Sequence, residues 1–213
     1  MTSSKKLGTV GLVARFKPLH KGAALMLETV CSLADHVKIG IGSSNKYNLR
    51  NPFFPQESEA MIDNFLREKF HNYEFLQIPD FGNGKKWREY VVNQYGSLDY
   101  FITANPYVKD LLENDYTVVH PASLIPKEKW FMLRGTEVRL HMAHGKDWQS
   151  LVPDAVAAYL LDEKNGNISE GYANLVERFC NKFGKEVLSV VNIESDYKRT
   201  ETREEEEKHS KEK

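Results

Sequence analysis

Four basic side chains lie close together near the start of the chain, and their types suit the binding of phosphate groups. They are Arg15, Lys17, His20 and Lys21. The apolar run 7–14 precedes them and a helical spacing of apolar residues follows, so the sequence predicts a strand, a basic turn and a helix start. Cations beside the backbone N–H groups of a helix N-terminus make an electropositive pocket for a polyphosphate. Nucleotide chemistry is therefore the first hypothesis.

The composition restricts the class of protein and the kinds of partner. With 213 residues the chain is long enough for one domain with a full core. A net charge of -1 gives no global basic field, so we expect no nucleic-acid partner. Cys31 and Cys180 lie far apart without metal-ligand spacing, which indicates core thiols in a reducing compartment. The apolar run after residues 1–6 is too short for a signal peptide or a membrane span, so we expect a cytoplasmic protein with no membrane partner.

The apolar pattern alternates between short strand-like runs and longer helical stretches, which is typical of an α/β domain with a parallel sheet. The predicted strands are 7–14, 37–42, 73–78, 99–104 and 116–119, and the predicted helices between them are 21–35, 56–69, 85–95 and 106–114. This order predicts a Rossmann-like, doubly wound parallel sheet. Ligands bind beyond the carboxyl ends of such strands, which places the segments 14–22, 43–55, 80–87 and 104–106 at the site.

The chain after the last predicted strand contains more helices and then a charged tail. Helices over 135–145 and 153–163 are expected to close the site from one side. Residues 166–195 are predicted to hold a helix, 169–184, and a strand, 185–192. Residues 1–6 are expected to be flexible, and the almost wholly charged segment 196–213 is expected to be disordered because it has too little apolar surface to bury.

The basic turn also carries a resemblance to known enzymes. Residues 15–22 read Arg-Phe-Lys-Pro-Leu-His-Lys-Gly and resemble the Arg-Phe-Gln-Pro-x-His-x-Gly-His signature of the HxGH nucleotidyltransferase superfamily. Further motifs follow in order at 40–44, 50–53, Asp80 with Trp87, 105–106, 135–139 and 148–153. Over about residues 7–163 the series resembles the archaeal-type nicotinamide-nucleotide adenylyltransferases, so residues 7–165 are expected to form a nucleotidyltransferase domain.

The resemblance implies a reaction and the residues that perform it. Enzymes of this kind transfer the adenylyl group of ATP to nicotinamide mononucleotide, with Mg²⁺ assisting, and release NAD and pyrophosphate without a covalent intermediate. By resemblance Arg15, His20 and Arg139 are the catalytic residues. The residues expected around ATP are Ala14, Arg15, Phe16, Lys17, His20, Lys21, Gly22, Ala23, Asn105, Arg134, Gly135, Thr136 and Arg139. Such enzymes commonly form homo-oligomers, so one is expected here.

The mononucleotide half of the site is carried over in the same way. The residues expected there, and around the product NAD, are Gly40, Gly42, Ser43, Arg50, Asn51, Phe53, Asp80 and Trp87. The indole of Trp87 offers a flat surface to the cationic nicotinamide ring. We assign no protein ligands to the metal, because the phosphates of ATP supply most of its oxygens.

Three positions depart from the family pattern. Ala23 stands where the signature ends in His, Lys17 where Gln is usual, and Arg134 where Ser commonly precedes Gly-Thr. We hypothesise that the cations Lys17, Lys21 and Arg134 replace part of the stabilisation that the missing imidazole would give. Nicotinic acid mononucleotide stays open as a second substrate. The alternatives are another HxGH transferase with a different acceptor, such as a flavin or pantetheine phosphate, and a nucleotide-binding sensor with little turnover.

Overall fold

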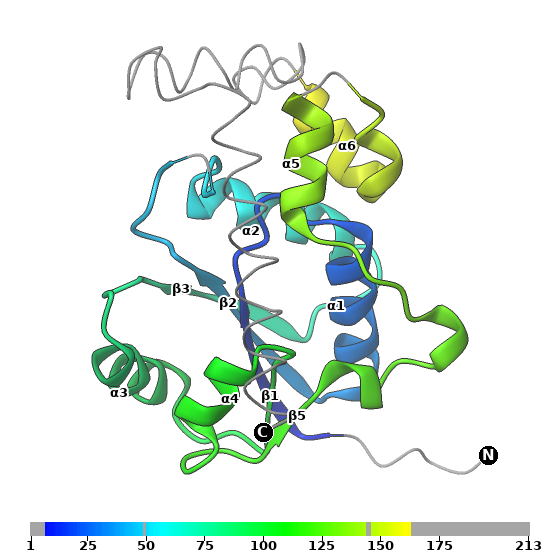
Figure 1. Cartoon of the computed structure of the whole chain (residues 1–213). Coiled ribbons are helices and arrows are strands. Elements are labelled where there is room, and N and C mark those ends of the chain that lie inside the picture. The colour runs from blue at the N-terminus through cyan, green and yellow to red at the C-terminus, as the bar shows by residue number, and fades with distance from the viewer. Residues whose placement is uncertain (1–6, 49, 144–145, 163–213) are drawn as a thin grey trace, which may run out of the picture.

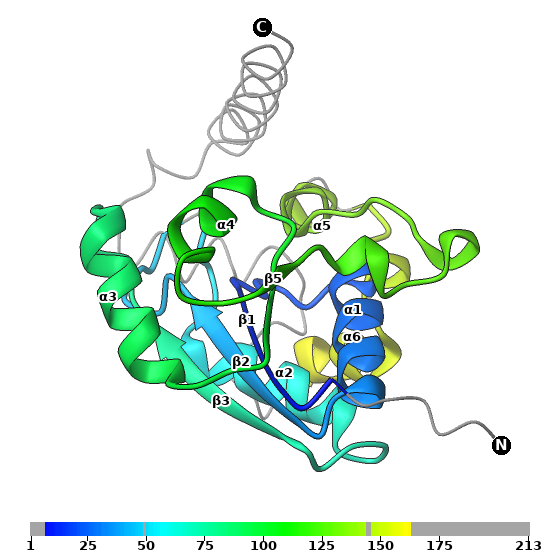
Figure 2. The ribbon, with the colours of Figure 1, turned by 90° about the horizontal axis from the view of Figure 1, so that it is seen from below.

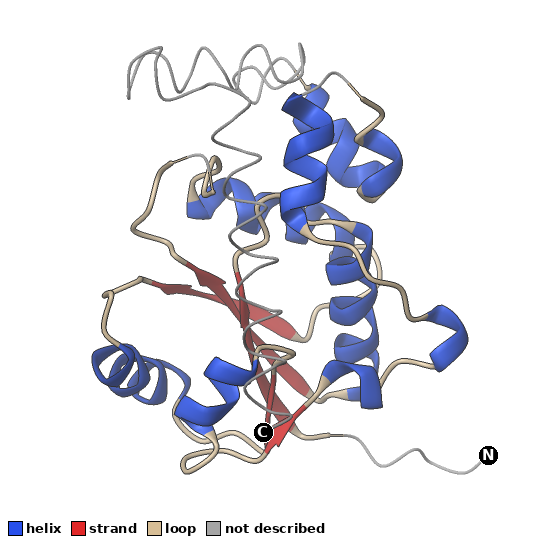
Figure 3. Ribbon diagram, viewed as in Figure 1, coloured by secondary structure: helices blue, strands red, loops and turns tan. Residues whose placement is uncertain are grey.

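A five-stranded parallel sheet forms the centre of the protein (Figure 3). The computed structural model describes residues 7–48, 50–143 and 146–162. The strands are β1 (Thr9–Ala14), β2 (His36–Gly42), β3 (Tyr73–Ile78), β4 (Tyr100–Ile102) and β5 (Val118–Val119), in the order β3-β2-β1-β4-β5. Neighbouring strands are parallel throughout. The predicted doubly wound parallel sheet is therefore confirmed.

Helices cover both faces of the sheet (Figures 1 and 2). The helices α1 (Lys21–Leu33) and α2 (Pro55–Leu66) lie on one face, and α3 (Gly84–Tyr95) and α4 (Pro106–Leu112) lie on the other. Three short 3₁₀ turns, η1 (Pro121–Ser123), η2 (Lys127–Lys129) and η3 (Gln149–Leu151), accompany the last two helices, α5 (Gly135–Ala143) and α6 (Asp154–Leu161). Because α6 packs against α2, the end of the described chain lies on the α1–α2 side.

The last two strands are shorter than the sequence predicts, for local reasons. Beyond β4 the hydroxyl of Thr103 accepts a hydrogen bond from the N–H of Asn105 at 3.1 Å, which turns the chain toward α4. Before β5 the N–H of Tyr116 still donates to the carbonyl of Leu112, at 2.9 Å, as in the last turn of a helix. The bonds that pair β4 with β5 therefore end at Thr103, whose N–H donates to the Val119 carbonyl at 3.2 Å, and begin at Thr117, whose carbonyl accepts from Phe101 at 3.0 Å.

Two buried clusters hold the layers together. The larger one joins β1 and β2 to α1, α2, α5 and α6, and it includes Cys31, as predicted for a core thiol. The smaller one lies under α3 and α4 and is centred on Tyr95 and Phe101. Helix α2 begins at Pro55, and the carboxylate of Glu57 accepts from the N–H of Phe54 at 2.7 Å, so its start is capped as well as proline-initiated.

Tyr95 reaches across the sheet from the end of α3. Its side chain is fully buried and its hydroxyl donates to the carbonyl of Leu12 at 2.7 Å. A Cβ on Gly11 or Gly40 would collide with this ring or its hydroxyl. Tyr95 thus fills the space beside Gly40, a residue expected in the mononucleotide half of the site.

Several predictions fall outside the described residues. These are the flexible segment 1–6, the helix 169–184, the strand 185–192, the charged tail 196–213 and Cys180. Within the described ranges no helix is both long and apolar enough to cross a membrane.

Candidate functional site

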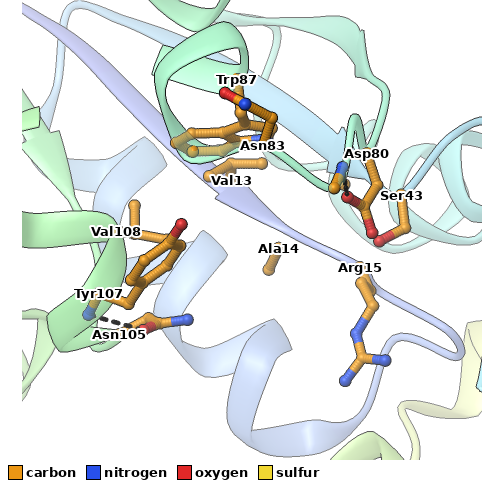
Figure 4. A pocket seen from close by; sticks show the side chains of 13 residues that line it. Val13, Ala14, Arg15, Ser43, Asp80, Asn83, Trp87, Asn105, Tyr107 and Val108 are labelled. Atoms are coloured by element: carbon orange, nitrogen blue, oxygen red, sulfur yellow. Dashed lines mark hydrogen bonds between the residues drawn. The ribbon is translucent and has the colours of Figure 1, made fainter. Parts of the chain in front are cut away.

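A cavity of about 340 Å³ opens at the carboxyl ends of the central strands. It lies where β1 has β2 on one side and β4 on the other, which is the usual ligand position in doubly wound sheets. Its volume is at the lower end of the range of small-molecule pockets. The residues that line it are Val13, Ala14, Arg15, Gly42, Ser43, Asp80, Gly82, Asn83, Gly84, Trp87, Asn105, Tyr107 and Val108 (Figure 4).

One end of the cavity is aromatic. Trp87 from α3 and Tyr107 from α4 lie at this end, with Val13 and Val108 nearby (Figure 4). Each helix begins at an asparagine cap. Asn83 accepts from the N–H of Lys86 at 2.9 Å, and Asn105 accepts from the N–H of Tyr107 at 3.0 Å. The caps fix where the two helices start, and so they help to fix the positions of Trp87 and Tyr107 near those starts.

The other end is polar and is built from two linked loops. Ser43 and Asp80 lie near each other there, with Arg15 at the same end (Figure 4). Asn45 clamps the backbone of Asp80 in both directions, because its Nδ2 donates to the Asp80 carbonyl at 2.9 Å and its Oδ1 accepts the Asp80 N–H at 2.8 Å. The carboxylate of Asp80 accepts the N–H of Gly82 at 2.9 Å. The position of this acidic group is thus set by hydrogen bonds within the loops.

His20 caps the first helix and is neutral. Its Nδ1 accepts the N–H of Ala23 at 3.2 Å, so the ring proton is on Nε2. Burial, followed by the positive charge of Arg139, lowers the pKa of His20 from 6.5 to about 4. A neutral imidazole with an Nε2–H donor is suited to hydrogen-bond a phosphate oxygen at physiological pH.

Because the pKa of His20 is lower in the fold than in the unfolded chain, stability should fall in acid. In the unfolded chain His20 takes up a proton below about pH 6.5, while in the folded protein it stays neutral down to about pH 4. This difference lowers the free energy of unfolding by up to about 3 kcal/mol as the pH falls through that window. We expect His20→Asn to lose less unfolding free energy than wild type between pH 7 and pH 4.5 in urea titrations. His120→Asn is the matched control, since His120 also caps through Nδ1 but is exposed. Equal losses in all three proteins would contradict the prediction.

The start of α5 meets the start of α1 around Gly135. Arg139 is only 8% exposed, and it donates from Nη1 to the carbonyl of Lys17 at 2.8 Å and from Nη2 to Thr136 Oγ1 at 3.1 Å. A Cβ on Gly135 would lie 3.4 Å from Arg139 Nη1, 3.5 Å from the Lys17 carbonyl and 3.7 Å from His20 Cδ2. Four groups that can bind an anion therefore lie close together here: the N-termini of α1 and α5, the imidazole of His20 and the guanidinium of Arg139.

Comparison with known proteins gives a consistent result. The chain is similar to the nicotinamide-nucleotide adenylyltransferase of Thermococcus kodakarensis, with 34% identity over 157 residues that span 71% of this chain and 81% of that protein. It is 36% identical over 154 residues to the Pyrococcus furiosus enzyme of the same name, spanning 70% of this chain and 80% of that protein. The chain belongs to the archaeal-type nicotinamide-nucleotide adenylyltransferase family. No family model matches the chain.

The fold agrees with that family. A bifunctional NMN adenylyltransferase/ADP ribose pyrophosphatase from Francisella tularensis, crystallised with AMP and a manganese ion, aligns with a TM-score of 0.58 and 17% identity. The alignment covers 92% of this chain and 56% of that longer chain. A putative nicotinate-nucleotide adenylyltransferase from Vibrio parahaemolyticus aligns with a TM-score of 0.51 and 16% identity over 72% of this chain and 98% of that one. At these identities the likeness shows the Rossmann-like nucleotidyltransferase fold.

The structure brings most residues of the adenylyltransferase pattern together in two adjoining groups. Those that line the cavity are Ala14, Arg15, Gly42, Ser43, Asp80, Trp87 and Asn105. Those around the α1 and α5 starts are His20, Gly22, Ala23, Gly135, Thr136 and Arg139. Arg134 is half-buried beside this second group, whereas Lys21 and Arg50 are exposed.

Several side chains predicted to contact a nucleotide are used elsewhere. Phe16 is 4% exposed and Phe53 fully buried, and both belong to the larger core cluster. Asn51 is 5% exposed, and its Nδ2 donates to Asn48 Oδ1 at 2.9 Å within its own loop. The ammonium of Lys17 is directed to the Ser43 carbonyl, at 3.0 Å. For Phe16, Phe53 and Lys17 the expected side-chain contact with the ligand is not supported, because the rest of the fold encloses these groups.

Three lining residues, Val13, Tyr107 and Val108, lie outside the segments that the sequence places at the site, and three more, Gly82, Asn83 and Gly84, lie in the expected segment 80–87 but were not predicted individually. The pair Asn83-Gly84 is a helix-cap pattern that points to a loop end at the site. Gly84 leaves room there for the hydroxyl of Tyr107, which a Cβ at position 84 would displace. For Tyr107 and Val108 the sequence carries no such signal, because their place at the cavity follows from how α4 packs beside α3.

Proposed function

We propose that this chain transfers the adenylyl group of ATP to nicotinamide mononucleotide and releases NAD and pyrophosphate. The observation that carries the proposal is the placement of a cationic cradle, around Gly135, next to a cavity with an aromatic end at Trp87. The two are joined through Lys17, whose carbonyl accepts from Arg139 and whose ammonium donates to Ser43. Membership of the family supports the same reaction.

In this proposal the phosphate of the mononucleotide attacks the α-phosphorus of ATP in line. The protein's task is to align two anions and to neutralise the departing pyrophosphate. His20 donates from Nε2 to a phosphate oxygen, and the start of α5 and the guanidinium of Arg139 hold the triphosphate on the other side. Arg15 follows β1 directly and contributes its charge where the cavity meets the cradle. No residue needs to form a covalent bond to substrate.

The few carboxylates at the described site are compatible with a metal ion that binds together with the nucleotide. Within the described ranges no group of three or more His, Cys, Asp or Glu side chains is placed to hold a metal ion. Mg²⁺ usually keeps several waters and is bound by substrate phosphates with one or two carboxylates, and the cavity wall offers the single carboxylate of Asp80. We therefore propose Mg²⁺ bound mainly by ATP, where it would offset negative charge on the phosphates.

We propose that the nicotinamide ring packs on Trp87 at the aromatic end. Trp87→Ala is expected to weaken binding of nicotinamide mononucleotide about three- to thirtyfold, because stacking and cation–π contacts are lost. ATP affinity should change little, and calorimetry with each nucleotide measures both. The control is Trp130→Ala, since Trp130 lies beyond η2, where it contacts His120. Selective loss of ATP binding in Trp87→Ala would show that the adenine occupies this end.

The decisive experiment measures pyrophosphate release and NAD formation from ATP, Mg²⁺ and nicotinamide mononucleotide. Stoichiometric production of both supports the proposal. Nicotinic acid mononucleotide, flavin mononucleotide and phosphopantetheine are tested as acceptors in the same assay, and turnover with only one of the last two would identify another HxGH transferase. Binding of both nucleotides without pyrophosphate release would favour the sensor. A homo-oligomer, which we also propose, is tested on the same preparation by light scattering.

A further inference from the structure

Lys17 is a lysine whose side chain lies almost entirely inside the protein. It is 2% exposed, although it sits in the loop that follows β1. Its Nζ donates to the carbonyl of Ser43 in the loop that follows β2, at 3.0 Å. Burying an ammonium is costly, and the hydrogen bond to Ser43 offsets part of that cost.

The charges that face Lys17 are mostly of its own sign. Burial, Arg15 and Arg139 together lower the pKa of Lys17 from 10.5 to about 8, and only Glu57 opposes them. An ammonium whose role was to attract phosphate would be better placed at the surface of the cavity, as Arg15 is. The burial and the neighbours of Lys17 indicate a role inside the protein.

The turn that Lys17 holds has a strained backbone. Ser43 has a φ of 50°, which is uncommon for a residue with a side chain. The following residues attach the turn to the end of β3, because the N–H of Ser44 donates to the Ile78 carbonyl at 3.1 Å and Asn45 clamps Asp80. A continuous chain of contacts thus runs from Lys17 through the Ser43 turn to Asp80. Ser43 and Asp80 line the cavity, and Lys17 does not.

The two ends of Lys17 serve different halves of the site. Its carbonyl accepts from Arg139, in the proposed phosphate clamp, while its ammonium holds the Ser43 turn. A substitution at position 17 removes the second contact and leaves the first in place, because the backbone carbonyl is present in every variant. The role of the side chain is therefore separable by mutation.

We infer that Lys17 is a positioning residue, whose side chain fastens the Ser43 turn and so places Asp80 in the mononucleotide half of the cavity without contacting phosphate. The inference rests on the proposed function for the identity of the ligand in that half.

The test compares two neutral replacements, Lys17→Gln and Lys17→Met, in the full chain. Gln keeps an N–H donor directed toward Ser43, whereas Met keeps a similar length with no donor. Any loss of affinity caused by the missing charge is common to both variants. We expect Lys17→Met to bind nicotinamide mononucleotide at least about tenfold more weakly than Lys17→Gln, with similar ATP affinities for the two, by calorimetry. Lys38→Met is the control, since Lys38 also donates to a buried carbonyl, that of Tyr95 at 2.9 Å, away from the cavity.

A second variant tests the next link and does not depend on a buried position. Asn45 is exposed, so Asn45→Ala should fold, and it is expected to weaken mononucleotide binding by about tenfold while ATP binding is kept. The inference is overturned if Gln and Met are equivalent at position 17, or if Asn45→Ala binds the mononucleotide as wild type does. If the wild-type chain binds neither nucleotide, the proposed function fails as well. If it binds both nucleotides and the variants behave as wild type, only the inference about Lys17 fails.

Discussion

Arg139→Gln should lower kcat/KM for adenylyl transfer by about a hundred- to a thousandfold, the usual cost of losing one well-placed transition-state donor. Arg139 is buried beside His20 and Gly135, and its hydrogen bonds to the Lys17 carbonyl and to Thr136 set the plane of the guanidinium. Charge that develops on the leaving pyrophosphate would meet a donor that is already oriented. Steady-state rates of pyrophosphate release at varied ATP measure the effect.

A matched arginine separates this effect from a loss of stability. Arg88 is also held by two short hydrogen bonds, to the carboxylate of Asp115, but this pair joins α3 to the turn that follows α4 and does not line the cavity. Arg88→Gln is expected to lower the melting temperature and to keep kcat/KM within about threefold. If Arg139→Gln retained wild-type kcat/KM while losing stability, Arg139 would be a structural residue only.

Ala23→His is expected to raise turnover by about a hundred- to a thousandfold, which is the gain from supplying one transition-state donor. Position 23 lies in the first turn of α1, and its N–H is already bonded to His20 Nδ1, so a side chain there starts beside the proposed phosphate cradle. By the resemblance drawn from the sequence, the HxGH signature has a histidine at this position. The measurement is kcat for NAD formation under saturating ATP and mononucleotide.

The control for an added imidazole is Ser32→His, which places histidine at an exposed position near the other end of α1. This change is expected to leave kcat unaltered. Robust wild-type turnover that Ala23→His does not increase would show that His20 and the neighbouring cations suffice. Absent turnover in both proteins, with nucleotide binding intact, would support the sensor.

The fold was predictable because its signals are local. The apolar runs of β1 and β2 are long, and the caps and prolines at the helix starts are read from neighbouring residues. The ends of β4 and β5 were not predictable to the residue, since they depend on contacts such as Thr103 with Asn105. The order of the strands required the three-dimensional structure.

In the candidate site, too, the local features were predictable from the sequence and the contacts between distant residues were not. His20 and Arg139 were found from motif spacing, and they do lie together. The surroundings of Gly40 and Lys17 were not predictable, because their neighbours, Tyr95 and Ser43, are 55 and 26 positions away in the chain and no local pattern predicts those contacts. A lysine in a basic turn normally faces solvent, and only the closing of the β2 loop over it encloses the side chain.

The bond from Tyr95 to Leu12 ties together the two ends of the ligand site. Tyr95 terminates the helix that carries Trp87, and Leu12 lies in the strand that leads to Arg15. The helix that carries Trp87 is therefore attached to the strand that leads to Arg15 by a buried hydrogen bond. Under the proposed function, a fixed span of this kind would favour acceptors whose ring and phosphate are separated by a matching length over longer acceptors.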